Sequence, residues 1–389
     1  MLVLFFSIML QSAMIGAQSA SGIELSQMET IFAFGDSYSY TGYQPQTGLN
    51  NLQGIGNTSS GGLNWVQYLA ASNPATASSY YDLAYSGATT NRSIVTASEG
   101  TPAFVDQVIL WEQYFDPAPN EVPWKSNTTL FAAWFGINDV GFSYVDGKNL
   151  TEELPAIFDT WDRLINVLYQ GGARNFLVMG IPPMQRTPLV QSYGEAAQDI
   201  FAAYISEYNV ALSDYTTRIP TYYAGAKVAL FDTQPFFNAI LDSPTDYGFI
   251  DSTAYCNVYA GITNQPNITL PACTWPLAEY TWWNEYHPTW PVHKLLADVV
   301  ATTLASPANT TASSSGTSTT AYPSTYIPTT SPTVTTPAAS TASGSVGPSS
   351  TGKGKSNSAR RSAGGRAGCT TAGAVVLGAV LGAAGVGLF

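Results

Sequence analysis

The sequence predicts an α/β fold, a three-layer α/β/α sandwich with a central parallel sheet of about five strands. Five short apolar runs alternate with longer amphipathic segments, typical of helices, along residues 23–304. The apolar runs have no polar face, as expected of strands that helices cover on both sides. Alternation of strands and helices implies right-handed crossovers and therefore parallel strands.

The expected elements follow one another in order along this region. The first strand is TIFAF at residues 30–34, and the other strands are expected at residues 80–84, 129–135, 175–179 and 227–231. Helices are expected at residues 63–71, 104–115, 156–169, 195–217 and 291–304. The segment at 156–169 is the clearest helix, because its large apolar residues share one face and Gly171 follows as a stop.

Three segments outside residues 23–304 differ in composition. Residues 1–20 are apolar and end in small residues, as in a secretory signal peptide; a buried N-terminal helix is the alternative. Residues 305–352 are mostly Ser, Thr and Pro without charge, which indicates an O-glycosylated stalk. Residues 353–389, a polar basic spacer and an apolar tail, indicate a GPI-anchor signal with attachment at Asn357 or Ser358; a tail anchor or a merely apolar terminus is the alternative.

Sequons and cysteines support a secretory route. Six Asn-x-Ser/Thr sequons predict glycosylation on surface loops, at Asn57, Asn91, Asn127, Asn149, Asn267 and Asn309. Cys256 and Cys273 are close in sequence, and we expect them to form a disulfide worth about 3 kcal/mol in the chain-entropy model. The third cysteine, Cys369, lies in the tail that we expect to be removed.

The charge of the chain limits its partners. All 26 acidic residues but only nine of the 14 basic ones lie in residues 23–304, a formal charge of −17. Such a domain repels nucleic acid and anionic membrane surfaces, so we expect no nucleic-acid partner and membrane attachment only through a lipid anchor. With two histidines and no metal-type cysteine pair, a histidine-rich metal site is excluded, and no metal or cofactor is expected.

A serine and a histidine are the candidate catalytic pair. Ser37 follows the first expected strand, at the sheet edge where functional residues of parallel sheets collect. A hydroxyl needs an adjacent base to act as a nucleophile, and the two histidines, His287 and His293, share one stretch, NEYHPTWPVH. We expect His293, inside the last helix, to be a packing or surface residue. The alternative for Gly-Asp-Ser is structural, since we expect Asp36 and Ser37 to cap a following helix.

Four separated motifs carry a family resemblance. Gly-Asp-Ser at Ser37, then Gly87, then Gly-Ile-Asn-Asp at Asn138 and Asp139, and finally His-Pro-Thr at His287 occur in the order found in SGNH hydrolases, also called GDSL esterases/lipases. The segments SYSYTGY, LNWVQYL, LFAAWFGINDVGFSY, GIPPMQRTP and WNEYHPTWPVH, with the cysteine pair, resemble fungal acetyl esterases of carbohydrate esterase family 16. The resemblance implies the flavodoxin-like SGNH fold. No G-x-S-x-G motif of the α/β-hydrolases is present.

The resemblance implies a role for each matching residue. Ser37 is the implied nucleophile and His287 the implied base. The backbone N–H groups of Ser37 and Gly87, with the Asn138 side-chain amide, form the implied oxyanion hole, which stabilises the negative charge of a tetrahedral intermediate. The alternatives are structural: Asn138 as a turn residue and Gly87 as a backbone requirement.

One position departs from the family pattern. The usual orienting acid is an Asp three residues before the histidine, where this chain has Asn284, followed by Glu285. An Asn carbonyl can hold the imidazole tautomer but cannot stabilise the imidazolium by charge. Two interpretations remain open, a Ser–His dyad helped by Asn284 or a backbone carbonyl, or a carboxylate supplied by Glu285, and we favour the dyad with Asn284. A third is loss of catalysis.

The sequence therefore predicts a carboxylic ester hydrolase. We expect a secreted, surface-tethered monomer that removes acetyl groups from a small-molecule or oligosaccharide ester. The alternatives are a lipase or lysophospholipase of the same fold and a non-catalytic, glycan-binding wall protein. Aromatic residues near the motifs favour a carbohydrate ester modestly, and we expect half of them to be core: Tyr38, Tyr40, Tyr43, Tyr85, Tyr144, Trp282, Trp283, Tyr286 and Trp290.

Overall fold

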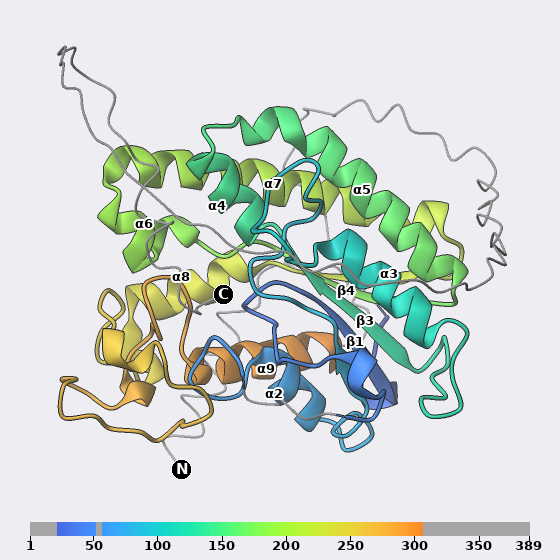
Figure 1. The fold of residues 1–389 in the computed structure, drawn as a ribbon, viewed down its shortest axis with the longest axis horizontal. Coiled ribbons are helices and arrows are strands. Elements are labelled where there is room, and N and C mark those ends of the chain that lie inside the picture. The colour runs from blue at the N-terminus through green and yellow to red at the C-terminus, as the bar shows by residue number, and fades with distance from the viewer. Residues whose placement is uncertain (1–21, 52–56, 306–389) are drawn as a thin grey trace, which may run out of the picture. The chain divides into compact units, whose positions relative to one another are not determined.

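The computed structural model describes residues 22–51 and 57–305 (Figure 1). The predicted signal peptide and GPI-anchor signal, and the stalk after residue 305, lie outside these ranges, as do Asn309 and Cys369. No helix within the described ranges is long and apolar enough to cross a membrane.

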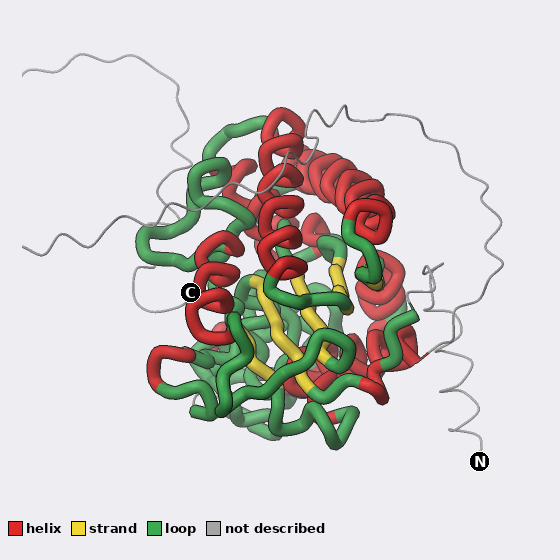
Figure 2. Tube along the Cα trace, turned by 90° about the vertical axis from the view of Figure 1, so that its right-hand side faces the viewer, coloured by secondary structure: helices red, strands yellow, loops and turns green. Residues whose placement is uncertain are grey.

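A five-stranded parallel sheet forms the centre, in the order β2-β1-β3-β4-β5. Helices lie on both sides of it (Figure 2), so the predicted three-layer α/β/α fold is confirmed. All five expected strands are present, and their ends differ from the expected ones by no more than two residues. They are β1 (Thr30–Gly35), β2 (Tyr80–Asp82), β3 (Thr129–Trp134), β4 (Asn175–Met179) and β5 (Lys227–Phe231).

The helices pack in two groups. Helices α2 and α9 contact each other on one face of the sheet, and α3, α5 and α7 form a connected layer on the other (Figure 1). The five expected helices are confirmed, while α4, α6 and α8 were not expected. The α-helices are α2 (Trp65–Ala71), α3 (Phe104–Phe115), α4 (Ile137–Val145), α5 (Leu150–Gln170), α6 (Pro188–Ser192), α7 (Glu195–Tyr222), α8 (Thr233–Asp242) and α9 (Trp290–Ala305). Short 3₁₀ helices lie at Leu25–Gln27, Pro45–Thr47, Met184–Arg186, Pro244–Tyr247, Asn257–Tyr259 and Leu277–Glu279.

The core between these layers is aromatic. Phe32 of β1 lies at its centre, with the rings of Phe115 and Phe131 at 4.8 and 5.3 Å between centroids. Four tryptophans are fully buried around the sheet, Trp65, Trp111, Trp134 and Trp161. Since large rings bury much apolar surface and interlock, this packing fixes the strand ends that carry the site.

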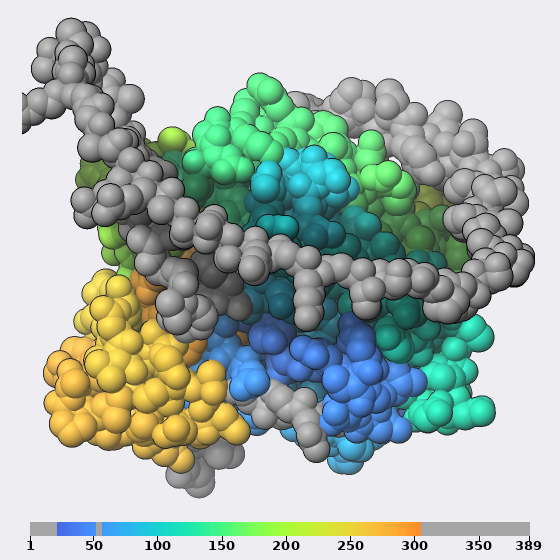
Figure 3. Space-filling model, viewed as in Figure 1, coloured from blue at the N-terminus to red at the C-terminus, as the bar shows by residue number. Residues whose placement is uncertain are grey.

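A second, smaller core lies in the long connection between α8 and α9. Tyr259, Leu277, Tyr280 and Trp283 form it, and the Cys256–Cys273 disulfide, which confirms the predicted pairing, joins its loops. In the space-filling view the segment of the chain that encloses this core, coloured yellow to orange, forms one corner of the surface (Figure 3). This lobe directly precedes the His287 loop.

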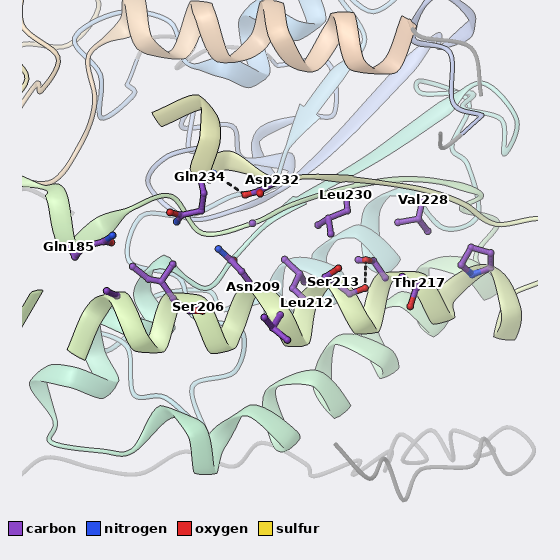
Figure 4. Close-up of a pocket in the computed structure, with 16 residues that line it drawn as sticks. Gln185, Ser206, Asn209, Leu212, Ser213, Thr217, Val228, Leu230, Asp232 and Gln234 are labelled. Atoms are coloured by element: carbon purple, nitrogen blue, oxygen red, sulfur yellow. Dashed lines mark hydrogen bonds between the residues drawn. The ribbon is translucent and has the colours of Figure 1, made fainter. Parts of the chain in front are cut away.

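A groove of about 660 Å³ lies between α7 and the edge strand β5 (Figure 4). Its floor and walls include Ile205, Asn209 and Ser213 of α7 and Val228 and Leu230 of β5. None of the candidate catalytic residues lines it, so the chemistry belongs elsewhere.

Candidate active site

Ser37 lies in a tight turn directly after β1. The Asp36 carboxylate accepts a hydrogen bond from the Tyr38 backbone N–H at 2.9 Å, and the Asp36 carbonyl accepts from Tyr40 N–H at 2.9 Å. The expectation that Asp36 and Ser37 cap a helix is wrong. The Asp36 side chain instead forms a local turn by accepting the backbone N–H two residues further along the chain. The next α-helix that the structure describes, α2, instead uses Asn64 as its cap.

The end of β1 is held by a residue that sequence reasoning missed. Gln107 of α3, fully buried, donates to the Gly35 carbonyl at 2.8 Å and accepts from the Gly35 N–H at 3.0 Å. A side chain at Gly35 is excluded, since a Cβ there would lie 2.7 Å from Ser39 Oγ and 3.0 Å from the Trp134 carbonyl. The one signal for Gln107 was an amide among the apolar residues of an expected helix.

The structure brings Ser37 and His287 together. Nε2 of His287 lies 2.7 Å from Ser37 Oγ, although 250 residues separate them in the chain. Nδ1 of the same ring lies 3.0 Å from Asn284 Oδ1. That oxygen also accepts the backbone N–H groups of Tyr286 and His287, at 2.8 and 2.7 Å. Because the amide oxygen Oδ1 has no hydrogen to donate, Nδ1 of His287 must carry the ring proton. Nε2 then presents its lone pair to the Ser37 hydroxyl.

Glu285, the alternative orienting residue, lies apart from the imidazole. In the described part of the chain no hydrogen bond or ion pair joins its carboxylate to His287, and its backbone carbonyl accepts from Leu189 N–H at 2.8 Å. The geometry therefore favours Asn284 over Glu285.

Aromatic rings surround His287. The ring centroids of Tyr38, Tyr286 and Trp283 lie 5.5, 5.6 and 6.2 Å from that of the imidazole. The Tyr38 hydroxyl donates to the Tyr286 carbonyl at 2.6 Å and so ties the serine turn to the histidine loop. Burial among these groups lowers the pKa of His287 to about 3, because a charged imidazole loses its hydration there. The neutral, proton-accepting form therefore predominates down to acidic pH.

His293, the competing base, is a packing residue in α9, as expected. Its side chain is 2% exposed, and its ring centroid lies 6.2 Å from that of Tyr38. Burial lowers its pKa to about 3 as well. Tyr38 is thus next to both histidines, but only His287 contacts Ser37.

The two remaining motif residues lie on neighbouring loops. Gly87 follows β2 with a φ of +76°, a conformation that glycine adopts without strain. Asn138 lies in the first turn of α4, and its Nδ2 donates to the Ala88 carbonyl at 3.0 Å. An amide NH₂ has two hydrogens, so this bond orients the group and leaves the second hydrogen for a ligand.

The aromatic residues near the motifs divide between core and rim. Tyr38, Tyr43, Trp282 and Trp283 are buried, which agrees with the expectation that about half are core. Tyr85 is 36% exposed and lies two residues before Gly87, and its ring packs against Tyr40 at 5.6 Å between centroids. The Tyr85 N–H donates to the Gly35 carbonyl at 3.0 Å, which places this pair beside the serine turn.

The family follows from a sequence comparison. Residues 31–300 match the model of the GDSL-like lipase/acylhydrolase family. The chain belongs to this family. Within the family it is similar to an acetylesterase of Thermothelomyces thermophilus, 34% identical over 297 residues that cover 74% of this chain and 92% of that protein. An acetylesterase of Hypocrea jecorina is 26% identical, over 67% of this chain and 84% of that protein.

This GDSL-family protein is a carboxylic ester hydrolase, as the sequence predicted, and the resemblance to fungal acetyl esterases is confirmed. Among solved structures, an acetylxylan esterase of Geobacillus stearothermophilus is 15% identical with a TM-score of 0.38, over 74% of this chain and 96% of that one. At that score the likeness adds nothing to the topology that the sheet itself shows.

Proposed function

We propose that this protein is a serine esterase that removes acetyl groups from sugar hydroxyls. The observation that carries the proposal is the 2.7 Å contact between Ser37 Oγ and His287 Nε2, in the tautomer that accepts a proton. The acetylesterase relatives support acetyl as the acyl group, since one of them is 34% identical over nearly its whole length.

The proposed reaction passes through an acyl-enzyme. Ser37 Oγ attacks the ester carbonyl while its proton moves to Nε2 of His287. The carbonyl oxygen becomes an oxyanion that accepts hydrogen bonds from Ser37 N–H, Gly87 N–H and the Asn138 amide. When the intermediate collapses, His287 returns the proton to the leaving alcohol oxygen. Water then attacks the acetyl-serine with His287 again as base, which releases acetate and restores Ser37.

Removal of the nucleophile tests this proposal. We expect Ser37→Ala to lose hydrolysis of p-nitrophenyl acetate by roughly 10⁴-fold or more. The folded variant should keep the near-UV circular dichroism of the parent. Turnover that survives in this variant would refute the serine mechanism. A preference for acyl chains of eight or more carbons would instead assign the site to a lipase.

The exposed Tyr85 supports a sugar on the alcohol side. An aromatic face at the rim can pack against the apolar face of a pyranose, while the small acetyl group needs little space behind Ser37. We expect Tyr85→Ala to raise KM for an acetylated oligosaccharide severalfold and to leave KM for p-nitrophenyl acetate unchanged. Equal effects on both substrates would argue against a sugar contact at Tyr85.

We propose that the protein is secreted and glycosylated, and tethered by a lipid anchor. The exposure of the sequons supports glycosylation, because acceptor side chains must reach an enzyme. Four are exposed in the structure, Asn57, Asn127, Asn149 and Asn267, whereas Asn91 is half-buried with its amide donating to Thr160 Oγ1 at 3.4 Å. Peptide mapping after glycosidase treatment should find glycans at those four sites, and release by a phosphatidylinositol-specific phospholipase tests the anchor.

A further inference from the structure

Two adjacent residues of α4 reach across to one loop. Asn138 Nδ2 donates to the carbonyl of Ala88 at 3.0 Å. Its neighbour Asp139 accepts the backbone N–H of Thr90 with both carboxylate oxygens, each at 3.1 Å. These bonds fall one and three residues after Gly87. The helix that carries one oxyanion donor is therefore joined at two points to the loop that carries another.

A charged carboxylate at Asp139 is energetically unfavourable, because this place in the fold is buried. Its side chain is fully buried, and no salt bridge to it occurs in the part of the chain that the structure describes. Burial raises the pKa of its carboxyl to about 7, which reports that the charged form is unfavourable there. A buried carboxylate without a cation is weak support for stability. Its hydrogen bonds to Thr90 instead indicate a role in fixing the geometry of the site.

The Gly87 loop depends on such contacts. Residues 83–103 connect β2 to α3 without a helix or strand, and Gly87 itself has room, since a Cβ there would meet nothing closer than 3.8 Å. The loop is fixed by individual hydrogen bonds, among them Ala88 N–H to the Tyr85 carbonyl and Phe104 N–H to the Thr89 carbonyl. Oxyanion donors act only when they lie about 2.7–3.1 Å from the developing charge.

We propose that Asp139 is a positioning residue that sets the spacing between the Gly87 N–H and the Asn138 amide. It touches neither the ester nor Ser37 and acts through Thr90 and through its place beside Asn138. Both charge states of the carboxyl keep an oxygen that accepts the Thr90 N–H, so the spacing holds across the pH range. The inference rests on the proposed function. It assigns to Asp139 a role, fixing the distance between two oxyanion donors, that neither donor performs itself.

A matched pair of variants tests it. Asp139→Asn keeps one carbonyl oxygen for Thr90, while Asp139→Leu keeps the branched shape and offers no acceptor. On p-nitrophenyl acetate we expect kcat to fall less than threefold in Asp139→Asn. In Asp139→Leu we expect kcat to fall about 10- to 100-fold with KM changed less than threefold, as for the partial loss of an oxyanion donor. Inhibition by a boronic acid, which mimics the tetrahedral intermediate, should weaken in parallel with kcat.

A double-mutant cycle separates positioning from general support of the fold. When Asn138→Ala is already present, Asp139→Leu should lower kcat by no more than a further threefold, because the spacing it sets no longer serves a donor pair. Losses that multiply fully, or an Asp139→Leu variant with wild-type kcat, overturn the inference. Ser37→Ala run in parallel keeps the outcomes distinct, since its turnover tests the proposed function and not Asp139.

Discussion

At the scale of single residues, His287, the proposed base, is held by a neutral partner. Asn284 Oδ1 fixes the Nδ1–H tautomer of His287 but adds no negative charge beside it. Aromatic rings fill the rest of the surroundings, and the pKa of His287 is lowered to about 3. A carboxylate at the same place would favour the charged imidazolium and raise that pKa. We therefore expect the amide to extend the active pH range toward acid.

A single substitution tests this effect. In the wild-type enzyme we expect kcat/KM for an acetyl ester to stay constant down to about pH 5 or lower, because the imidazole remains neutral. Asn284→Asp places an opposite charge against the ring and should move the acidic limb upward by about 1 to 3 pH units. Asn284→Ala is the control. It removes the acceptor that fixes the Nδ1–H tautomer of His287, so its effect should be present at every pH. A wild-type limb near pH 6.5, or an unchanged limb in Asn284→Asp, contradicts the interpretation.

At the scale of elements, the strands were predictable and the short helices were not. Strands β1, β3 and β4 are buried along their whole length, so their sequences are largely apolar and easy to recognise. Helix α4 has nine residues with Gly141 inside, and it begins after Gly136, whose φ is +114°. Such a segment has neither a cap signal nor enough length for a periodic pattern. The helix that carries Asn138 was therefore missed although the motif itself was recognised.

The site residues that belong to local sequence motifs were predictable. The residues that act through long-range contacts were not. Ser37 and His287 were identified from local patterns, and the structure joins them. Gln107 binds Gly35 across 72 residues of sequence, and the amide in its own segment does not indicate which residue it contacts. The same holds for the bond from Thr90 to Asp139, which only the packing of α4 on the Gly87 loop creates.

The disulfide lobe supports the loop that carries His287. Trp283, a member of the second core, donates from its indole to the Ile262 carbonyl at 3.2 Å, and its backbone N–H donates to the His287 carbonyl at 2.8 Å. We expect the double variant Cys256→Ser/Cys273→Ser to lose about 2–4 kcal/mol of stability, chiefly because its unfolded chain gains freedom.

Local loosening should precede global unfolding in that variant. The temperature at which esterase activity falls by half should drop by several degrees and should lie below the midpoint seen by far-UV circular dichroism. In the parent the two midpoints should coincide. Coincident midpoints in the variant would show that the lobe does not hold the histidine loop.

At the scale of the whole molecule, buried ionisable groups set how stability depends on pH. Burial raises the carboxyl pKa of Asp36 and Asp139 to about 7 and of Asp82 to about 8. Each therefore binds its proton more tightly when folded than when unfolded, and the fold gains stability as pH falls through these values. His287 and His293 have lowered pKa values and oppose this trend, but only below their unfolded value near 6.5.

The melting temperature should therefore rise as the pH is lowered from 8.5 to 6.5, and should rise more slowly below 6.5, where the two histidines offset part of the effect of the three carboxyls. Differential scanning calorimetry over that range measures the slope directly. Asp82→Asn, which keeps the shape without the titrating group, should show a shallower slope than the parent. A melting temperature that falls between pH 8.5 and 6.5 would contradict the assignment of these buried carboxyls.

The 250-residue interval between Ser37 and His287 also orders events during synthesis. At about 5–20 residues per second, the ribosome adds the histidine roughly 12 to 50 seconds after the serine. The growing polypeptide thus acquires its proposed nucleophile early and its proposed proton acceptor near the end of the catalytic domain. In the proposed mechanism the nascent chain cannot cleave an ester until translation of the catalytic domain is nearly complete.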